Sequence, residues 1–201
     1  MARTRDPSIE ARVLSAAVRA YAGAGWSKFG FDSVAKAAGV GKPALYLRWS
    51  SREDLLFAAV DLHMPAHELP DTGSIRDDMI GMATELLEGL IRGPGAAMVR
   101  LQVDVGTHPE LRRIHERLVL SRRGPSRAMV LRAIDRGELR PDTPITTLLD
   151  LVAGAIGNHL RTALAAEMPA LLQSIACYIE SVVDAALASF LVGGAPAQAS
   201  G

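Results

Sequence analysis

Several side chains between residues 33 and 52 have the chemistry needed to hold phosphates and to touch the edges of bases. Lysine and arginine pair with phosphate oxygens, hydroxyl and N–H groups donate to them, and small apolar surfaces can touch a thymine methyl group. The candidates of these types in this stretch are Ser33, Lys42, Pro43, Ala44, Arg48 and Arg52. Their types and spacing predict a surface that contacts double-stranded DNA.

Each of these residues suits a different contact. Lys42 could donate to guanine or to a phosphate, whereas Pro43 and Ala44 could only touch a thymine methyl group, so direct base readout is expected to be sparse. Arg48 can reach a phosphate or solvent. Ser33 can offer its hydroxyl and its N–H to a phosphate, and Arg52 can hold another one.

The elements that must position these side chains are two short helices joined by a tight turn. Asp32 and Ser33 are residue types that begin helices, and a second helix is expected from residue 42 or 43 to residue 49. Between them, Ala35 lets the helices approach, Gly39 allows a left-handed bend, and Leu45 fills the wedge. This spacing is typical of a helix-turn-helix, whose second helix enters the major groove.

The stretch AKAAGVGKPALYLRWSSREDLL, residues 35–56, resembles the DNA-binding signature of tetracycline-repressor-type (TetR-type) regulators. The resemblance is specific over residues 9–56 and weaker beyond them. Leu47 stands where many members have a second tyrosine, and Arg52 stands where lysine is usual. The resemblance implies that Tyr46 contacts the DNA backbone; the alternative is a ring packed against the first helix.

The charge of the chain is balanced overall but unevenly distributed. Lys plus Arg and Asp plus Glu each total 22. Residues 1–60 hold nine basic against five acidic residues, whereas the remainder holds 13 against 17. A basic N-terminal part on an acidic body suits a polyanionic partner at one end of the molecule.

The compartment follows from cysteine usage and from the lack of targeting signals. The single Cys177 cannot form an intrachain disulfide and suits a reducing environment. Arg3 and Arg5 are not followed by an apolar stretch, so no secretory signal is predicted. No run of apolar residues is judged long enough to span a bilayer. We therefore expect a soluble, cytoplasmic protein without a membrane partner.

Composition and periodicity predict an all-α fold of about nine helices. Hydrophobic residues make up 49% and aromatic residues only 4% of the chain, which favours helices packed through aliphatic side chains. We predict a helix-turn-helix head over residues 1–62, including the start of a connecting fourth helix. A helical-bundle domain for ligand binding and dimerisation follows over residues 63–193, and then a disordered tail over 194–201.

Within this plan, three aromatic residues and two glycine-proline sites carry specific expectations. Trp26, Phe29 and Trp49 are expected in the core of the head. Helices are expected over residues 74–92, 96–105, 109–136, 145–166 and 170–192. The sequence Gly93-Pro94-Gly95 should break the chain between two helices, and Gly124-Pro125 should kink or split the third of them.

The last two predicted helices are too apolar for the surface of a monomer. A helix that is apolar most of the way round must be buried on two sides, one in its own core and one in a partner. We therefore predict a homodimer through a four-helix interface, as the TetR resemblance also implies. The predicted interface residues are Leu149, Ile156, Leu160, Ile175, Ile179 and Val182.

The TetR resemblance also implies a small-molecule effector site inside the helical bundle. Methionines can supply the adaptable lining that such sites use, although methionine at helical spacing is more often core. Asn158 and His159 are polar groups in an apolar segment, and could instead form hydrogen bonds in a dimer interface. The candidate residues are Met79, Met82, Met98, Leu101, Met129, Asn158 and His159.

Other chemistry has little support in the sequence. His63 and His67 are separated by Pro65, and His108 with His115 is no better, so no metal site is predicted. Phosphate-binding glycine loops and nucleophile motifs are lacking, so neither an enzyme nor a cofactor is expected. The favoured function is a ligand-responsive repressor that binds an inverted-repeat operator as a dimer. The alternatives are an activator, or an all-α ligand-binding or dimerisation module without a DNA role.

Overall fold

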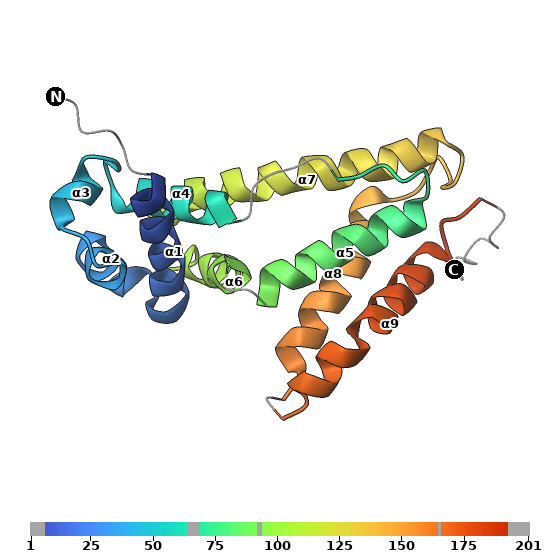
Figure 1. Ribbon diagram of the computed structural model, residues 1–201. Coiled ribbons are helices and arrows are strands. Elements are labelled where there is room, and N and C mark those ends of the chain that lie inside the picture. Colours follow the sequence, from blue (N-terminus) through green and yellow to red (C-terminus); the bar gives the residue numbers. More distant parts are fainter. Residues whose placement is uncertain (1–6, 64–68, 92–93, 165, 193–201) are drawn as a thin grey trace. The chain divides into compact units, whose positions relative to one another are not determined.

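The computed structural model describes residues 7–63, 69–91, 94–164 and 166–192. Its regular structure is helical, and within these ranges the only strand-like pairing is an isolated bridge between Leu139 and Leu191. Over these described ranges the chain has nine α-helices, in agreement with the prediction of an all-α chain of about nine helices. Figure 1 shows their arrangement. In order, the elements are α1 (Pro7–Ala24), the 3-10 turn η1 (Trp26–Lys28), α2 (Phe31–Ala38), α3 (Lys42–Tyr46), α4 (Arg52–His63), α5 (Ile75–Ile91), α6 (Pro94–Asp104), the 3-10 turn η2 (Pro109–Leu111), α7 (Arg112–Asp135), α8 (Ile145–Thr162) and α9 (Met168–Leu187).

The chain forms two compact units. The first, the head unit, comprises Met1–Ala66 and Gly89–Ser121, and the second comprises His67–Glu88 and Arg122–Gly201. This division differs from the predicted domains at residues 1–62 and 63–193, because α6 packs against α1 and α4 and so belongs with the head. The predicted tail at 194–201 lies outside the described residues.

The head unit is built around α1. This helix contacts α2, α4 and α6, and its apolar positions Val13, Ala17 and Tyr21 are buried. These positions recur every four residues and therefore lie on one face of the helix. The predicted core residues Trp26, Phe29 and Trp49 are between 1% and 7% exposed, which confirms that prediction.

In the second unit, α8 and α9 pack against each other (Figure 1). Val152 and Ile156 of α8 and Ile179 and Val183 of α9 are fully or almost fully buried. The Tyr178 hydroxyl donates a hydrogen bond of 3.3 Å to the Ala155 carbonyl between the two helices. Apolar burial therefore pairs the helices within one chain.

In the second unit, a polar network around Asp78 stabilises the start of α5. The Asp78 side chain is fully buried, and its Oδ1 accepts hydrogen bonds from the N–H and the hydroxyl of Thr72 at 2.8 and 2.7 Å. Its other oxygen lies 3.7 Å from a guanidinium nitrogen of Arg136. A buried carboxylate is tolerated here because a charge and two donors face it.

Two sequence predictions about helix breaks need correction. Pro125 lies inside α7, which is one helix from Arg112 to Asp135, so a split at Gly124-Pro125 is wrong. Proline removes one hydrogen bond but need not end a helix that is anchored on both sides, and Leu118 and Met129 are both buried. In addition, α6 begins at Pro94 rather than at residue 96, because proline suits the first turn of a helix.

The expectation that no apolar stretch could span a bilayer was too strict. By length and composition, α9 is long and apolar enough, with a mean hydropathy of 1.4 over its best window. The core helix of a soluble protein passes the same test, and Ile179, Val183 and Leu187 of α9 are buried within the protein. A single helix of this kind is weak evidence for a membrane span.

Candidate nucleic-acid interface

The turn between α2 and α3 has the predicted construction. Gly39 adopts a left-handed conformation with φ of 64° and ψ of 39°, and its N–H is directed at the carbonyls of Ala35 and Lys36. Ala35 is 4% exposed and Leu45 is fully buried, so the small residue and the wedge occupy the positions that the spacing predicted. The helix-turn-helix geometry is therefore confirmed.

The second helix of the motif, α3, is shorter than predicted and exposes one side. It ends at Tyr46 rather than at Trp49. Lys42, Pro43 and Tyr46 are exposed, whereas Ala44 is half-buried. Because the buried Leu45 holds the opposite side, the exposed residues form the surface that a groove of DNA could meet.

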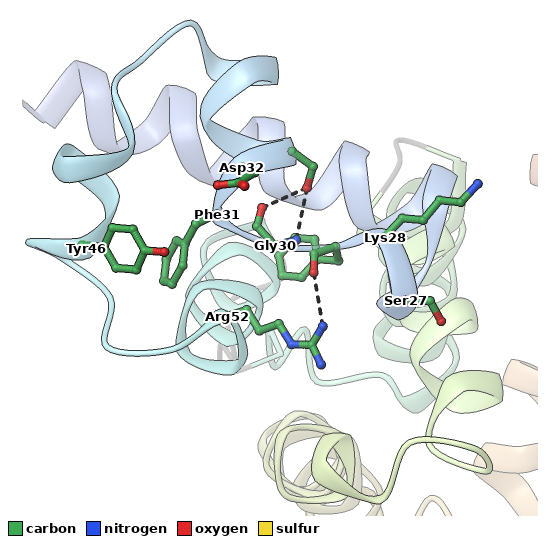
Figure 2. A pocket seen from close by; sticks show the side chains of 9 residues that line it. Ser27, Lys28, Gly30, Phe31, Asp32, Tyr46 and Arg52 are labelled. Atoms are coloured by element: carbon green, nitrogen blue, oxygen red, sulfur yellow. Dashed lines mark hydrogen bonds between the residues drawn. The ribbon is translucent and has the colours of Figure 1, made fainter.

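Tyr46 projects from the head with 60% of its surface exposed. Its ring centroid lies 4.5 Å from that of Phe31, at an angle of 46° (Figure 2). The alternative of a ring packed against the first helix is therefore wrong, because the contact is made by the start of α2.

Lys42 forms an ion pair with Asp32 of α2. Both side chains are largely exposed, at 54% for the lysine and 72% for the aspartate. Surface pairs of this kind contribute about 0–1 kcal/mol, so a phosphate or a base can compete for the ammonium group. Lys42 remains a candidate DNA contact, and Asp32, a residue type that favours the start of a helix, is its acidic neighbour.

The Ser33 hydroxyl has local partners. It donates to the Gly30 carbonyl at 2.9 Å and accepts from the Gly30 N–H at 3.1 Å. The helix thus begins at Phe31, with Ser33 reaching back to cap it, rather than at Asp32 or Ser33 as predicted. A phosphate would have to displace these bonds to use the hydroxyl.

Arg48 folds back along α3. One of its terminal nitrogens donates a hydrogen bond of 2.9 Å to the Ala44 carbonyl, and its Nε is buried without a hydrogen-bond partner. The side chain is half-buried overall. The structure therefore places Arg48 at the end of the motif, where it satisfies a backbone carbonyl of α3.

Arg52 lies against the surface of the head, with 37% of its side chain exposed. Its guanidinium carbon lies 3.9 Å from the centroid of the Trp26 ring, and Nη1 is 3.5 Å from the carbonyl oxygens of Trp26 and Phe29. Nη2 lies 3.7 Å from a carboxylate oxygen of Glu110. These contacts assign Arg52 a part in head packing that the sequence alone did not indicate.

Arg52 also lines an open surface cavity of about 390 Å³ on the head (Figure 2). Tyr46 and Asp32 lie along the same cavity, together with residues of the segment before α2. The lining residues are Ser27, Lys28, Phe29, Gly30, Phe31, Asp32, Ser33, Tyr46 and Arg52. Three of the seven predicted DNA contacts, Ser33, Tyr46 and Arg52, are thus brought together here.

Tyr21, Trp26 and Phe29 form an aromatic cluster in the head. The carboxylates of Asp104 and Glu110 connect this cluster to α6 and η2. Asp104 accepts hydrogen bonds from the Tyr21 hydroxyl at 3.0 Å and from the Trp26 N–H at 3.1 Å. The Trp26 indole N–H donates to Glu110 at 2.8 Å. Burial, followed by the hydrogen bond to Asp104, raises the pKa of Tyr21, so its hydroxyl stays protonated as a donor.

The environment of Glu110 favours its charged form. Hydrogen bonds from its own backbone and from the Trp26 indole lower the pKa of the Glu110 carboxyl, and His108 and Arg52 add smaller effects. Sequence reasoning missed Asp104 and Glu110, because they lie 78 to 84 residues from their partners and no motif links them. Asp104 and Glu110 meet these partners only when α6 and η2 pack beside α1 and η1.

Comparisons with known proteins decide the family. A family model described as "Bacterial regulatory proteins, tetR family" matches residues 13–59. Another, "Tetracyclin repressor-like, C-terminal domain", matches residues 69–186. The chain belongs to the TetR family. Its head is therefore the DNA-binding domain of a transcriptional regulator, and the protein is not an enzyme.

Curated relatives agree with this assignment. The HTH-type transcriptional regulator AqdR of Rhodococcus erythropolis is 30% identical over 169 residues, which cover 84% of this chain and 81% of that protein. The DNA-binding transcriptional repressor TetR of Mycobacteroides abscessus is 29% identical over 161 residues, covering 78% and 84%.

A solved structure with the same fold is the SmeT–triclosan complex. It superposes with a TM-score of 0.64 at 18% identity, and the match covers 96% of this chain and 98% of that one. At this identity the likeness establishes the fold of the TetR-family chain.

The candidate effector residues of this TetR-family chain are divided between its two units. Leu101 is buried in the core of the head unit, and Met98 packs against that core. In the second unit, Met79 and Met129 are fully buried and Met82 is half-buried. This division gives Met98 and Leu101 a packing role in the head.

The two polar candidates for the effector site lie near the end of α8. The His159 ring stacks on Tyr178, with centroids 3.9 Å apart, and Asn158 is exposed and accepts a 2.6 Å hydrogen bond from Arg161. Among the described residues, no group of three or more His, Cys, Asp or Glu side chains could hold a metal. His67 lies outside the described residues.

The predicted dimer residues split into two sets. Ile156 and Ile179 are at most 2% exposed within a single chain, so their assignment to a partner surface is corrected: they belong to the packing of α8 against α9. The other four, Leu149, Leu160, Ile175 and Val182, are half-buried.

Large apolar side chains are also exposed on or beside the same two helices. Leu151 of α8 is 49% exposed, Leu172 of α9 is 39% exposed, and Leu164 between the helices is 64% exposed. Sequence periodicity identified apolar helices correctly but did not separate the buried side of each helix from its open side.

Proposed function

We propose that this TetR-family regulator is a cytoplasmic repressor that binds an inverted-repeat DNA operator as a homodimer and is released by a small-molecule effector. The observation that carries the proposal is the exposed side of α3, where Lys42, Pro43 and Tyr46 stand opposite the buried Leu45. Lys42 can reach a base or a phosphate, and Tyr46 can donate to the backbone. Such sparse base chemistry is consistent with modest specificity per half-site.

A dimer would present a second recognition helix, so that the two half-sites together provide the specificity for the operator. The four half-buried interface candidates are Leu149 and Leu160 on α8 and Ile175 and Val182 on α9. The exposed Leu172 lies three positions before Ile175 on α9 and so shares its side of that helix. Covering this face removes apolar surface from water. A two-fold dimer predicts half-sites spaced about 34 Å apart, one helical turn of DNA, or a little more.

The repressor and effector assignments draw on relatives. The Mycobacteroides abscessus relative is named a DNA-binding transcriptional repressor, and a protein of the same fold has been solved with triclosan. A small molecule would release DNA only if it binds more tightly to a dimer whose heads are spaced wrongly for the operator. The candidate residues for the effector site are Met79, Met82, Met129, Asn158 and His159.

Selection from a random duplex library with the full-length protein tests the DNA function. We expect an enriched inverted repeat, protected in footprints of DNA upstream of the gene. Sedimentation at micromolar concentration should give a dimer. A compound screen should then find molecules that abolish protection. Failure to enrich any duplex sequence would favour the alternative of a ligand-binding or dimerisation module without a DNA role.

The sign of regulation needs a separate measurement. Transcription from a promoter that carries the selected operator should fall when the protein is added and recover with the effector. A rise in transcription on addition of the protein would favour an activator over a repressor.

A further inference from the structure

The recognition helix α3 is too short to hold its own orientation. It has five residues, whereas isolated helices shorter than about 12–15 residues are marginal in water. Its N-cap residue, Gly41, makes no side-chain capping hydrogen bond. Leu45 fixes the inner side of the helix through burial. The direction of its outward side chains must therefore be set by other contacts.

Two consecutive residues of α2 make those contacts. Lys42 and Tyr46 lie four positions apart, so they share one side of α3. The carboxylate of Asp32 pairs with the ammonium group of Lys42. The centroid of the Phe31 ring lies 4.5 Å from that of Tyr46, and Figure 2 shows the two rings facing each other. The first turn of α2 thus contacts both the first and the last residue of the recognition helix.

We propose that Phe31 and Asp32 are positioning residues that set how Lys42 and Tyr46 meet DNA, and that Asp32 sharpens the preference for operator over other duplex DNA. This inference rests on the proposed DNA-binding function. Asp32 holds the Lys42 ammonium and places a negative charge close to where phosphates would approach. Lys42 leaves this partner only where DNA offers a better acceptor, which disfavours indiscriminate phosphate contacts.

Phe31 acts on Tyr46 in a different way. An exposed tyrosine loses rotational freedom when it binds, and this loss weakens affinity. A ring already resting on Phe31 has fewer orientations to lose. Phe31 therefore strengthens binding through Tyr46, without touching DNA itself.

A double-mutant cycle tests the Asp32–Lys42 pair. Operator and unrelated duplexes are titrated by fluorescence anisotropy at several salt concentrations, with wild type, Asp32→Asn, Lys42→Gln and the double variant. Asp32→Asn should tighten binding to unrelated duplex about threefold, as expected for loss of a weak surface pair. Its salt dependence should steepen by about one unit of slope, because a freed Lys42 adds one phosphate contact.

The controls separate this effect from general electrostatics. In the Lys42→Gln background, Asp32→Asn should leave the slope unchanged, and Asp32→Glu should restore discrimination to nearly the wild-type value. Asp61→Asn removes the same charge from an exposed position on α4 and should not lower discrimination. An unchanged salt slope in Asp32→Asn, or the same change with and without Lys42, overturns the role of Asp32.

A second cycle tests Phe31. Phe31→Leu should weaken operator binding severalfold in the wild-type background and have no effect in the Tyr46→Ala background. Equal losses in both backgrounds would mean that Phe31 acts on the fold of the head, and would overturn its positioning role. If the wild-type protein selects no operator at all, the proposed function fails. If it selects an operator and the effects in these cycles are additive, only this inference fails.

Discussion

The guanidinium group of Arg52 stacks over the ring of Trp26, with its central carbon 3.9 Å from the ring centroid. The indole N–H of the same tryptophan donates to Glu110 at 2.8 Å. A cation on one side and a carboxylate at the edge complement the charge distribution of an indole. This relationship links the start of α4, the 3-10 turn η1 and the 3-10 turn η2 within the head unit.

Replacing Arg52 should therefore affect stability as well as DNA binding. We expect Arg52→Ala to lower the free energy of unfolding of the head by about 0.5–1 kcal/mol, the usual size of an exposed cation–π contact. Arg52→Lys keeps the charge but loses the planar stacking, so it should recover only part of that loss. Thermal unfolding followed by tryptophan fluorescence measures the effect. An Arg52→Ala protein as stable as wild type but weaker on DNA would instead identify a direct phosphate contact.

Protonation of the Glu110 carboxylate should make the head less stable at acid pH. Its folded-state pKa is lowered from the ordinary value of 4.5, chiefly by hydrogen bonds from its own backbone and from Trp26. Its contribution is therefore fully present above pH 4.5 and is lost as the pH falls through the lower, folded-state pKa.

Stability measured by chemical denaturation between pH 7 and pH 3 checks this sign. The Glu110→Gln variant should lose less stability over the acid part of that range than wild type does. A steeper acid loss in the variant would contradict the assignment.

The buried carboxylate of Asp78 should be costly to remove. Asp78→Ala leaves the Thr72 N–H and hydroxyl without an acceptor and leaves Arg136 without one of its acidic partners. We expect a loss of about 3 kcal/mol in the free energy of unfolding, typical of a broken buried polar network. Urea denaturation measures it. The adjacent Asp77 is exposed, so Asp77→Ala is the matched control and should change stability by less than about 0.5 kcal/mol.

Substitution of Gly39 should lower the stability of the head because of the left-handed backbone conformation alone. Its φ is 64°, and a Cβ there would meet nothing within 4 Å, so Gly39→Ala suffers strain but no clash. The expected loss is about 1–2 kcal/mol. Gly39→Asn should lose less, since asparagine tolerates the left-handed region.

Gly23 provides the comparison within the same unit. It lies in α1 with open space at its Cβ position and a φ outside the left-handed region, so Gly23→Ala should be neutral or slightly stabilising. Thermal unfolding of Gly39→Ala, Gly39→Asn and Gly23→Ala gives the order of their stabilities. Equal melting temperatures for Gly39→Ala and wild type would contradict the requirement for a left-handed residue.

Local features of the head were readable from the sequence because they depend on neighbours in the chain. The spacing of Ala35, Gly39 and Leu45 predicted the bend and the wedge, and glycine is the residue that adopts a left-handed turn without strain. Hydrophobic periodicity likewise predicted the helices. Of the kink or split predicted at Gly124-Pro125, the split is wrong, because α7 continues through Pro125 with buried residues on both sides of it.

The partners of the candidate DNA contacts were not readable in the same way. Lys42, Arg48 and Arg52 are all cations in the sequence. In the structure, Lys42 pairs with Asp32, Arg48 donates to the Ala44 carbonyl of α3, and Arg52 stacks on Trp26. Each outcome depends on which residues folding brings within a few ångströms.

By itself, the sequence determined that the chain is helical, that residues 31–49 form a helix-turn-helix, and that the chain resembles the TetR family. These properties follow from short-range spacing and residue type. Only the tertiary structure decided that α6 and the start of α7 join the head, that Asp104 and Glu110 hold its aromatic cluster, and which sides of α8 and α9 stay open. The reason is physical: hydrogen bonds and stacking act over a few ångströms, and contacts between residues some 80 positions apart exist only once the chain has folded.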